Sequence, residues 1–408
     1  MRPRSWLCGP SAPGALALVF FIFVCVFLAL ACASKVASQT KKPTKLPRRL
    51  DQGVRWHRDP ATGELSVNWE GGAGGAASGG DAAGPVPLRV RTQVVAVTCI
   101  VSTGDGAAVP GLRREDFRIF DDGVERPISY FDASTQPASV ALVIDASPSV
   151  LRDSDEMKNA ADALIGALAP LDQAAVVDFS AHTYLQLGFS DAREQIRRAV
   201  ARVDPRELLG DTGGSNIYEA VYLAARELFA GRSGRKAIVL LTDGQDSGLG
   251  LTLDPASAAP GPGRPADRLT FDDVARLLAQ QDIQIFAVST ENRPKTMTPD
   301  WLAAHEGTTL VNPSARRLGI PPYTLYLAEL VRRAGGQLYF LREAETMADT
   351  FRKIAEKIRA EYTLGFYPAQ PLSSTNANFG WHSLRVEVAG QSNTRVSHRA
   401  AYYVPLTP

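Results

Sequence analysis

Val140-Ala141-Leu142-Val143-Ile144-Asp145-Ala146-Ser147-Pro148-Ser149 is the stretch that decides the fold, because an apolar run ends there in a cluster of oxygen-bearing side chains. Five consecutive apolar residues predict a buried strand. Asp145, Ser147 and Ser149 then offer a carboxylate and two hydroxyls on one tight loop, and short oxygen ligands of this kind suit Mg²⁺. Aspartate and serine are also ordinary turn and helix-capping residues, so these residues alone leave a capping role open.

Two later segments point to the same edge of a sheet. Gly213-Gly214-Ser215-Asn216-Ile217-Tyr218-Glu219-Ala220 places a hydroxyl at the start of a helical run. Ala237-Ile238-Val239-Leu240-Leu241-Thr242-Asp243-Gly244 is a second buried-strand pattern, and it ends in an aspartate and a glycine turn. In an open α/β sheet, ligands bind outside the carboxyl ends of the strands, where the strand order reverses. We therefore expect the three loops to meet at that edge.

Together these three segments resemble the metal-ion-dependent adhesion site of the von Willebrand factor type A domain. In that family two serines and a threonine contact the ion directly, while the first and last aspartates act through water or complete the shell. The resemblance implies Mg²⁺ or Mn²⁺ as cofactor and a site made of Asp145, Ser147, Ser149, Ser215 and Asp243.

One position departs from the family pattern, since Ser215 stands where the family usually has threonine. Serine keeps the oxygen but lacks the methyl group that stiffens χ1, which favours weaker ion binding at a site that survives. Thr212 is an alternative for the same role, although its spacing to the following helix fits the motif less well.

Helical and strand-like segments alternate through the middle of the chain. Strands are expected at 140–144, 174–179, 237–243, 283–289 and 337–341, and helices at 157–168, 192–203, 217–229, 271–281, 325–334 and 346–359. This alternation predicts an α/β domain over residues 136–361, with a doubly wound, mostly parallel sheet of the Rossmann-like kind found in von Willebrand factor A domains. Two irregular segments interrupt it, 248–268 and 291–322. The first follows Asp243, and it either shapes a ligand surface or is a solvated insertion.

β-rich segments flank this domain on both sides. Residues 88–135 contain a strand-like run and a hairpin around Asp121-Asp122-Gly123, and residues 362–408 contain further alternating strands. A module as short as 88–135 is marginal alone, so we expect the C-terminal segment to pair with it. Over about residues 88–404 the arrangement resembles bacterial, especially acidobacterial, exported proteins related to von Willebrand factor type A. That resemblance implies an architecture and no particular partner.

The N-terminal segment has the pattern of a targeting sequence. Arg2 and Arg4 precede an apolar run that ends near residue 33, with small-residue cleavage options, so residues 1–33 read as a signal peptide or a membrane anchor. Cys32 leaves lipid attachment open as well. Residues 34–87 are basic and then rich in Gly and Ala, which predicts a disordered linker. We therefore expect an exported chain, periplasmic, in the cell envelope or extracellular, with membrane anchoring undecided.

Composition and motifs narrow the function class. The chain has 44 Lys and Arg against 43 Asp and Glu, so no overall charge favours nucleic acid. The GxSxG, GxxxxGK and HExxH motifs of common enzyme classes are missing. The five histidines are scattered, and of these His182 lies in a turn at the sheet end where the metal loops are expected. We expect a hydrogen-bonded or surface role for each of them.

These observations predict a non-enzymatic binding or adhesion protein, whose metal captures an Asp or Glu carboxylate of a protein partner. A metal-dependent hydrolase that uses Asp145 or Asp243 is one alternative, although catalysis needs a positioned base or nucleophile besides the ion. An envelope scaffold with a purely structural metal is another.

Overall fold

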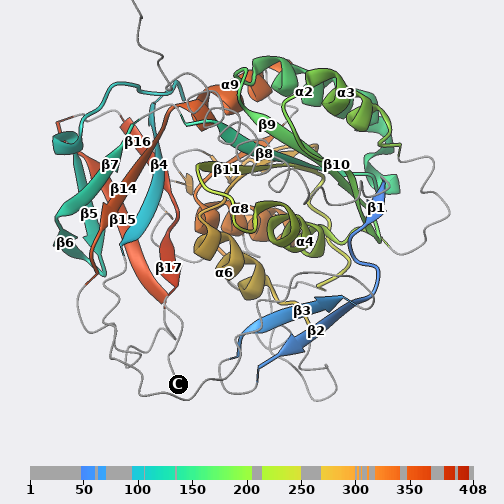
Figure 1. Cartoon of the computed structure of the whole chain (residues 1–408), viewed down its shortest axis with the longest axis horizontal. Coiled ribbons are helices and arrows are strands. Elements are labelled where there is room, and N and C mark those ends of the chain that lie inside the picture. The colour runs from blue at the N-terminus through green and yellow to red at the C-terminus, as the bar shows by residue number, and fades with distance from the viewer. Residues whose placement is uncertain are drawn as a thin grey trace, which may run out of the picture. The chain divides into compact units, whose positions relative to one another are not determined.

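A seven-stranded sheet with the order β1-β10-β9-β8-β11-β12-β13 forms the centre of the computed structural model (Figure 1). The strands from β9 through β8, β11 and β12 to β13 pair in parallel, whereas β10 and β1 are antiparallel to their neighbours. Their bounds are β1 (Arg48–Arg49), β8 (Ala138–Asp145), β9 (Gln173–Phe179), β10 (Thr183–Ser190), β11 (Arg235–Thr242), β12 (Gln284–Ser289) and β13 (Gln337–Phe340). The order reverses between β8 and β11, so the predicted doubly wound, mostly parallel sheet is confirmed.

The structure describes residues 47–59, 63–69, 94–104, 106–133, 136–204, 214–249, 268–298, 301–302, 305, 310–311, 318–340, 347–368, 381–390 and 394–403. All of them lie in one structural unit, Leu46–Pro408. The predicted signal peptide or anchor at 1–33, most of the irregular segment 248–268 and part of the segment 291–322 lie outside these residues. Among the described residues, every helix is too short or too polar to span a membrane.

Helices cover both faces of the sheet because β8 is apolar on both of its sides. Val140, Leu142 and Ile144 belong to one core, and Ala141 and Val143 belong to the other. Continuous apolar strands of this kind are typical of parallel sheets buried on both faces. The first core is covered by α2 (Ser154–Ala167), α3 (Arg193–Ala201) and α9 (Met347–Arg359), and the second by α4 (Ile217–Phe229), α6 (Phe271–Gln281) and α8 (Pro322–Ala334).

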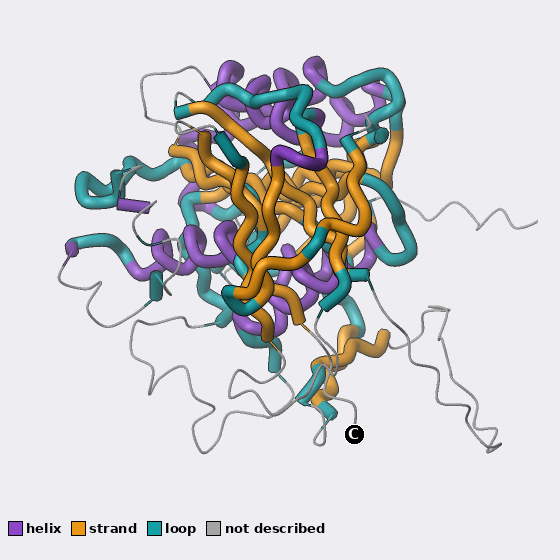
Figure 2. Tube along the Cα trace, turned by 90° about the vertical axis from the view of Figure 1, so that its left-hand side faces the viewer, coloured by secondary structure: helices purple, strands orange, loops and turns teal. Residues whose placement is uncertain are grey.

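A β module made from both ends of the chain lies beside this domain, and its strands face the viewer in Figure 2. Its two antiparallel sheets have the orders β16-β4-β14-β7 and β17-β15-β5-β6. The strands are β4 (Val95–Thr103), β5 (Phe117–Asp121), β6 (Val124–Arg126), β7 (Ile128–Asp132), β14 (Glu361–Phe366), β15 (Trp381–Val388), β16 (Thr394–His398) and β17 (Ala401–Tyr403). Because β4 pairs with β14 and β16, and β5 pairs with β15, the predicted joining of N- and C-terminal segments is confirmed.

Buried arginines fasten the module to the amino ends of the parallel strands. Arg235, the first residue of β11, donates to the carbonyl oxygens of Arg359 and Glu361, where α9 passes into β14. Arg399, which follows β16, donates to Asp282 at 2.9 Å, just before β12. The module therefore contacts the edge of the sheet opposite to the carboxyl ends of the strands.

The predicted linker at 34–87 is wrong for the stretch around Arg48–Trp69. There the structure has β1 and a hairpin of β2 (Val54–Arg58) and β3 (Leu65–Trp69). Trp56 packs edge-on against Tyr222 of α4, with ring centroids 5.3 Å apart, and Leu65 and Val67 are buried in the same core. The strands of this hairpin are only five residues long, so their alternation of apolar and polar residues is brief. The polar and Gly-rich composition of the surrounding sequence therefore led to the prediction of a linker. The remainder of the predicted linker, 34–46 and 70–87, lies outside the described residues.

Candidate metal centre

The first loop of the candidate site begins where β8 ends. Asp145 is the last residue of β8 and is 1% exposed. Its Oδ1 accepts a hydrogen bond from the backbone amide of Ser147 at 2.9 Å, which turns the chain back toward the carboxylate. A 3-10 turn, η2 (Pro148–Asp153), follows, and within it Ser149 lies with its Oγ 3.0 Å from the Oγ of Ser147. One carboxylate and two hydroxyls are thus gathered on one turn.

The second loop brings Ser215 to the same carboxylate. The Oγ of Ser215 donates to Asp145 Oδ2 at 3.3 Å, and Ser215 is 4% exposed. Ser215 precedes Asn216, the residue before the first turn of α4. The backbone of Ser215 is fixed from the other side, because its carbonyl accepts from the amide of Ser247 at 2.7 Å.

The third loop follows β11 and carries Asp243, which is 4% exposed. Its Oδ1 accepts from the backbone amide of Gln245 at 2.8 Å. The preceding residue, Thr242, donates from Oγ1 to Asp145 Oδ2 at 2.6 Å. The structure therefore brings all five predicted residues to the carboxyl ends of β8 and β11, where the strand order reverses.

The electrostatics of this site fit a cation. Burial and the negative charge of Asp243 raise the pKa of Asp145 to about 6, even though hydrogen bonds from Ser147 and Thr242 favour its ionised form. Among the described residues, hydroxyl and amide groups supply the hydrogen bonds of both carboxylates, and no basic side chain does. Buried charges are normally paired or bound to metal, so two adjacent acids and three hydroxyls form a donor set suited to a hard divalent ion.

Sequence reasoning missed two residues that organise these loops. Thr242 is the hydroxyl residue at the end of an otherwise apolar run, a signal that was available in the sequence. Asp246 accepts from the amide of Leu249 at 2.8 Å, and burial raises its pKa. The amide of Ser247 then holds the same loop to the carbonyl of Ser215, just before α4.

Two other sequence candidates have different outcomes. Thr212 lies outside the described residues. His182 is in the turn between β9 and β10, as expected, and its Nδ1 lies 2.8 Å from Asp51 Oδ2. It is therefore a hydrogen-bonded residue, bound to the N-terminal segment.

A second group of ligand-type side chains occurs in the β module. Asp121, Asp122 and His382 have ligand atoms within 4.8 Å of one another. Asp121 accepts from Tyr402 and Arg126, while Asp122 accepts from the amide and hydroxyl of Ser383 and lies 2.8 Å from His382. These hydrogen bonds join the turn after β5 to the neighbouring strand β15, so the cluster has a structural role.

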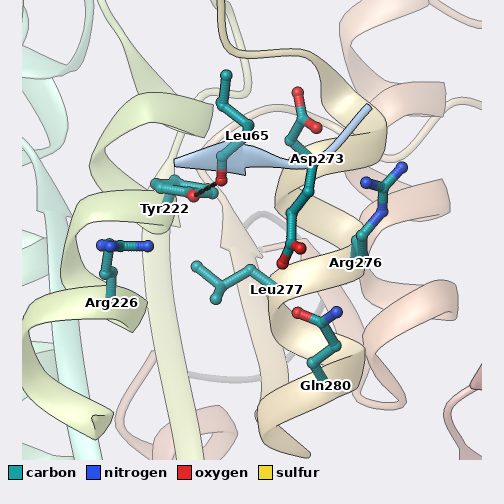
Figure 3. A pocket seen from close by; sticks show the side chains of 8 residues that line it. Leu65, Tyr222, Arg226, Asp273, Arg276, Leu277 and Gln280 are labelled. Atoms are coloured by element: carbon teal, nitrogen blue, oxygen red, sulfur yellow. Dashed lines mark hydrogen bonds between the residues drawn. The ribbon is translucent and has the colours of Figure 1, made fainter. Parts of the chain in front are cut away.

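A small pocket lies between β3 and the helices α4 and α6 (Figure 3). Its lining mixes both signs of charge, with Arg226 and Arg276 beside Asp273. The hydroxyl of Tyr222 donates to the carbonyl of Leu65 across it at 3.4 Å. None of the five candidate ligands lines this pocket.

The order of the sheet and the polar cluster at its reversal point define a doubly wound α/β domain with a ligand site at the carboxyl edge. Residues 140–245 match the family model described as von Willebrand factor type A domain. The chain therefore contains a domain of this family. The α/β unit built on the seven-stranded sheet is here called the A domain. No curated protein matches the chain.

Several solved structures are similar to parts of the chain. An aerotolerance-related membrane protein from Bacteroides fragilis, with multiple mutations to serines, is 17% identical, and the match covers 54% of this chain and 98% of that one with a TM-score of 0.37. A von Willebrand factor type A protein from Catenulispora acidiphila is 15% identical, with 78% and 75% covered and a TM-score of 0.35. Proximal thread matrix protein 1 from the mussel byssus, with a zinc-occupied MIDAS motif, is 16% identical, with 58% and 48% covered and a TM-score of 0.37.

Proposed function

We propose that this chain is an exported, non-enzymatic binding protein whose A domain uses a divalent metal to capture a carboxylate of a protein partner. The observation that carries the proposal is the convergence of Asp145 and Asp243 with three serine hydroxyls at the reversal point of the sheet. The buried pair of acids lacks a basic partner among the described residues, and a metal ion would relieve their repulsion.

The donor set explains why such an ion would bind a partner. The hydroxyls of Ser147, Ser149 and Ser215 are neutral ligands, so an ion held by them keeps much of its positive charge. Ser149 is exposed, whereas Ser147 and Ser215 are buried, so the site reaches solvent on the side of Ser149. Mg²⁺ or Mn²⁺ with an open position there would attract an Asp or Glu side chain presented by another protein. The even charge balance gives no support for nucleic acid as the partner.

The proposal includes a location outside the cytoplasm. The N-terminal pattern of residues 1–33 supports export to the periplasm, the envelope or the extracellular space, with membrane anchoring through that segment left open. Members of the von Willebrand factor type A family are typically adhesion or binding proteins, which agrees with such a location.

The two alternative functions make different demands on the site. A hydrolase needs a base or nucleophile beside the ion, and the side chains bonded to Asp145 in the described residues are serine and threonine hydroxyls, those of Ser215 and Thr242 among them. A scaffold with a structural metal would bind the ion but would keep its partner after chelation. Partner capture from envelope extract, with Mg²⁺ or with chelator, separates these cases.

Calorimetric titration of Mg²⁺ tests the site directly. We expect Asp145→Ala to abolish binding and Ser147→Ala and Ser149→Ala to weaken it strongly, while circular dichroism shows a retained fold. Ser129→Ala is the matched control, because it removes a serine hydroxyl that bonds only within the β module, to Gly365. Unchanged Mg²⁺ affinity in Asp145→Ala would remove this site from the proposal.

A further inference from the structure

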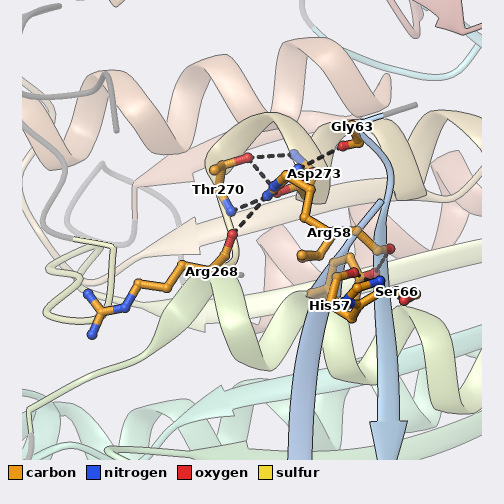
Figure 4. Close-up of polar contacts among 9 residues, drawn as sticks. His57, Arg58, Gly63, Ser66, Arg268, Thr270 and Asp273 are labelled. Carbon is orange, nitrogen blue, oxygen red and sulfur yellow. Dashed lines mark hydrogen bonds and ion pairs between the residues drawn. The ribbon is translucent and has the colours of Figure 1, made fainter. Parts of the chain in front are cut away.

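The N-terminal strap, defined as the described residues 47–59 and 63–69, is attached to the A domain at two places. At one end β1 extends the central sheet beside β10. At the other end the β2–β3 hairpin is held by Arg58, which bonds to both carboxylate oxygens of Asp273 on α6, at 3.0 and 2.7 Å, and to the carbonyl of Arg268 (Figure 4). The first attachment includes the turn that bonds to Asn216, and the second holds the first turn of α6.

Asp51 is the residue that fixes the strap to the turn between β9 and β10. Its carboxylate accepts two bonds from Arg49, at 3.0 and 2.9 Å, and one from the amide of Thr183 at 3.2 Å, and it contacts His182 Nδ1 at 2.8 Å. Burial opposes the ionisation of Asp51, but these hydrogen bonds outweigh it and lower its pKa. The amide of Leu50 also donates to the carbonyl of Thr183 at 2.7 Å. Both polar groups of the Thr183 backbone are therefore bonded to the strap.

The same turn holds the loop that carries Ser215. The carbonyl of Ser180 accepts from the backbone amide of Asn216 at 2.9 Å, and the carbonyl of Ala181 accepts from its side-chain amide at 2.8 Å. Asn216 directly follows Ser215, whose hydroxyl bonds to Asp145. Consecutive hydrogen bonds thus lead from Asp51 through the turn to a candidate ligand.

We propose that Asp51 is a positioning residue of the metal centre, which acts by holding the 180–183 turn so that its carbonyls place Asn216 and Ser215. This inference rests on the proposed metal site. Without Asp51, the amide of Thr183 loses its acceptor and the ring of His182 loses a contact, so the turn gains freedom that Asn216 and Ser215 share. The strap is then a functional part of the binding domain as well as part of its core. Spatial connection alone does not establish coupling, so the test measures coupling directly.

The experiment is calorimetric titration of Mg²⁺ into the full chain. We expect Asp51→Ala to weaken Mg²⁺ binding by about three- to tenfold. Loss of a residue that bonds directly to a metal-ligating side chain typically lowers metal affinity more, by ~10–100-fold. Asp51→Asn keeps an oxygen acceptor for the Thr183 amide, so it should recover most of the affinity. Arg58→Gln is the matched control, because it breaks a charged attachment of the same strap that does not involve the 180–183 turn, and its Mg²⁺ affinity should equal that of the unmodified chain.

A double-mutant cycle with Asn216→Ala identifies the route. If Asp51 acts through Asn216, the loss of affinity in the double variant will be smaller than the combined losses of the two single variants. Should Asp51→Ala fail to fold, Asp51→Ser enters the cycle instead, because its short side chain cannot bridge Thr183 and His182.

Three results overturn the inference. Normal Mg²⁺ affinity in Asp51→Ala would do so while leaving the proposed function intact, and so would equal weakening by Asp51→Ala and Arg58→Gln, which indicates general loosening. Absence of Mg²⁺ binding by the unmodified chain would remove the proposed function and this inference together.

Discussion

The hydroxyl of Thr242 joins the ends of β8 and β11 by donating to Asp145 Oδ2 across 2.6 Å. The Oγ1 of Thr242 also accepts from the backbone amide of Gly244 at 3.0 Å. Two of the three candidate metal loops are therefore held by one side chain. Thr242 is fully buried, so water cannot replace it in either bond.

Thr242→Val is expected to affect both stability and metal binding. Valine keeps the shape but removes one of the donors to Asp145 Oδ2 and leaves the buried amide of Gly244 without its acceptor, which costs about 1–3 kcal/mol in the free energy of unfolding. Mg²⁺ affinity should fall as well, because Asp145 loses one of the groups that orient it. Urea unfolding and Mg²⁺ titration measure the two effects. Thr242→Ser is the control, since it retains the hydroxyl, and equal behaviour of the Val and Ser variants would contradict the role given to this group.

Ser215→Thr is expected to preserve or tighten Mg²⁺ binding. The added methyl group restricts χ1 and holds Oγ in place without changing the ligand atom. Ser215→Ala, which removes that atom, should weaken binding strongly. Calorimetry on the three proteins ranks them, and a Thr variant that binds as weakly as the Ala variant would show that Ser215 is not placed as a ligand.

Asp178 gives a prediction about pH. Burial raises the pKa of Asp178 to about 6, from an ordinary value of 3.8, although Gln186 donates to it at 2.8 Å. Below about pH 4 this carboxyl is protonated in both folded and unfolded chains and has no effect. As pH rises toward 6, the unfolded chain loses its proton first, so the free energy of unfolding falls.

Asp178→Asn removes that loss and still accepts the bond from Gln186. The variant should be more stable than the unmodified chain at pH 7, by up to about 3 kcal/mol, and the difference should shrink toward pH 4. Denaturant unfolding at a series of pH values measures it. A difference that is constant across the series would show that Asp178 ionises normally in the folded state.

Gly336 is expected to tolerate no side chain. It lies between α8 and β13, and a Cβ atom there would overlap the carbonyl of Ile285 in the neighbouring strand β12. Because that carbonyl belongs to the backbone of a strand that is paired on both sides, Gly336→Ala should lower the free energy of unfolding by about 3 kcal/mol or more. Gly166→Ala is the matched control. It lies on the exposed side of α2 with open space around it, and alanine should raise helix stability by about 0.5–1 kcal/mol. Thermal unfolding that ranks the two variants alike would contradict the overlap.

The central sheet was predictable from the sequence because its strands are long, apolar and separated by amphipathic helices. Val140 to Ile144 and Ala237 to Leu241 need no distant information to be read as buried strands. The strap was not predictable in this way. Arg48–Arg49 forms a strand only because β10 offers an edge, and Trp56 is partly buried only because it packs against Tyr222.

The candidate site and its surroundings also include residues that the sequence predicts and residues, such as Asp51, that it does not. Asp145, Ser147 and Ser149 stand close together in the chain, so their meeting is local, and strand order explains how Ser215 and Asp243 join them. Asp51 is remote from all of these residues in the chain, and no local pattern marks it as a neighbour of the 180–183 turn. Its place depends on tertiary contacts that composition and periodicity do not encode.

The pairing of β4 with β14 and β16 has a consequence for synthesis of the chain. Both partners of β4 follow the A domain, so a ribosome completes that entire domain before either edge of β4 can be covered. During that interval Val97, Cys99 and Val101 lack the strands that bury them, and an uncovered apolar strand is prone to aggregate. Synthesis of β14 and β16 thus ends the period in which β4 is exposed on the nascent chain.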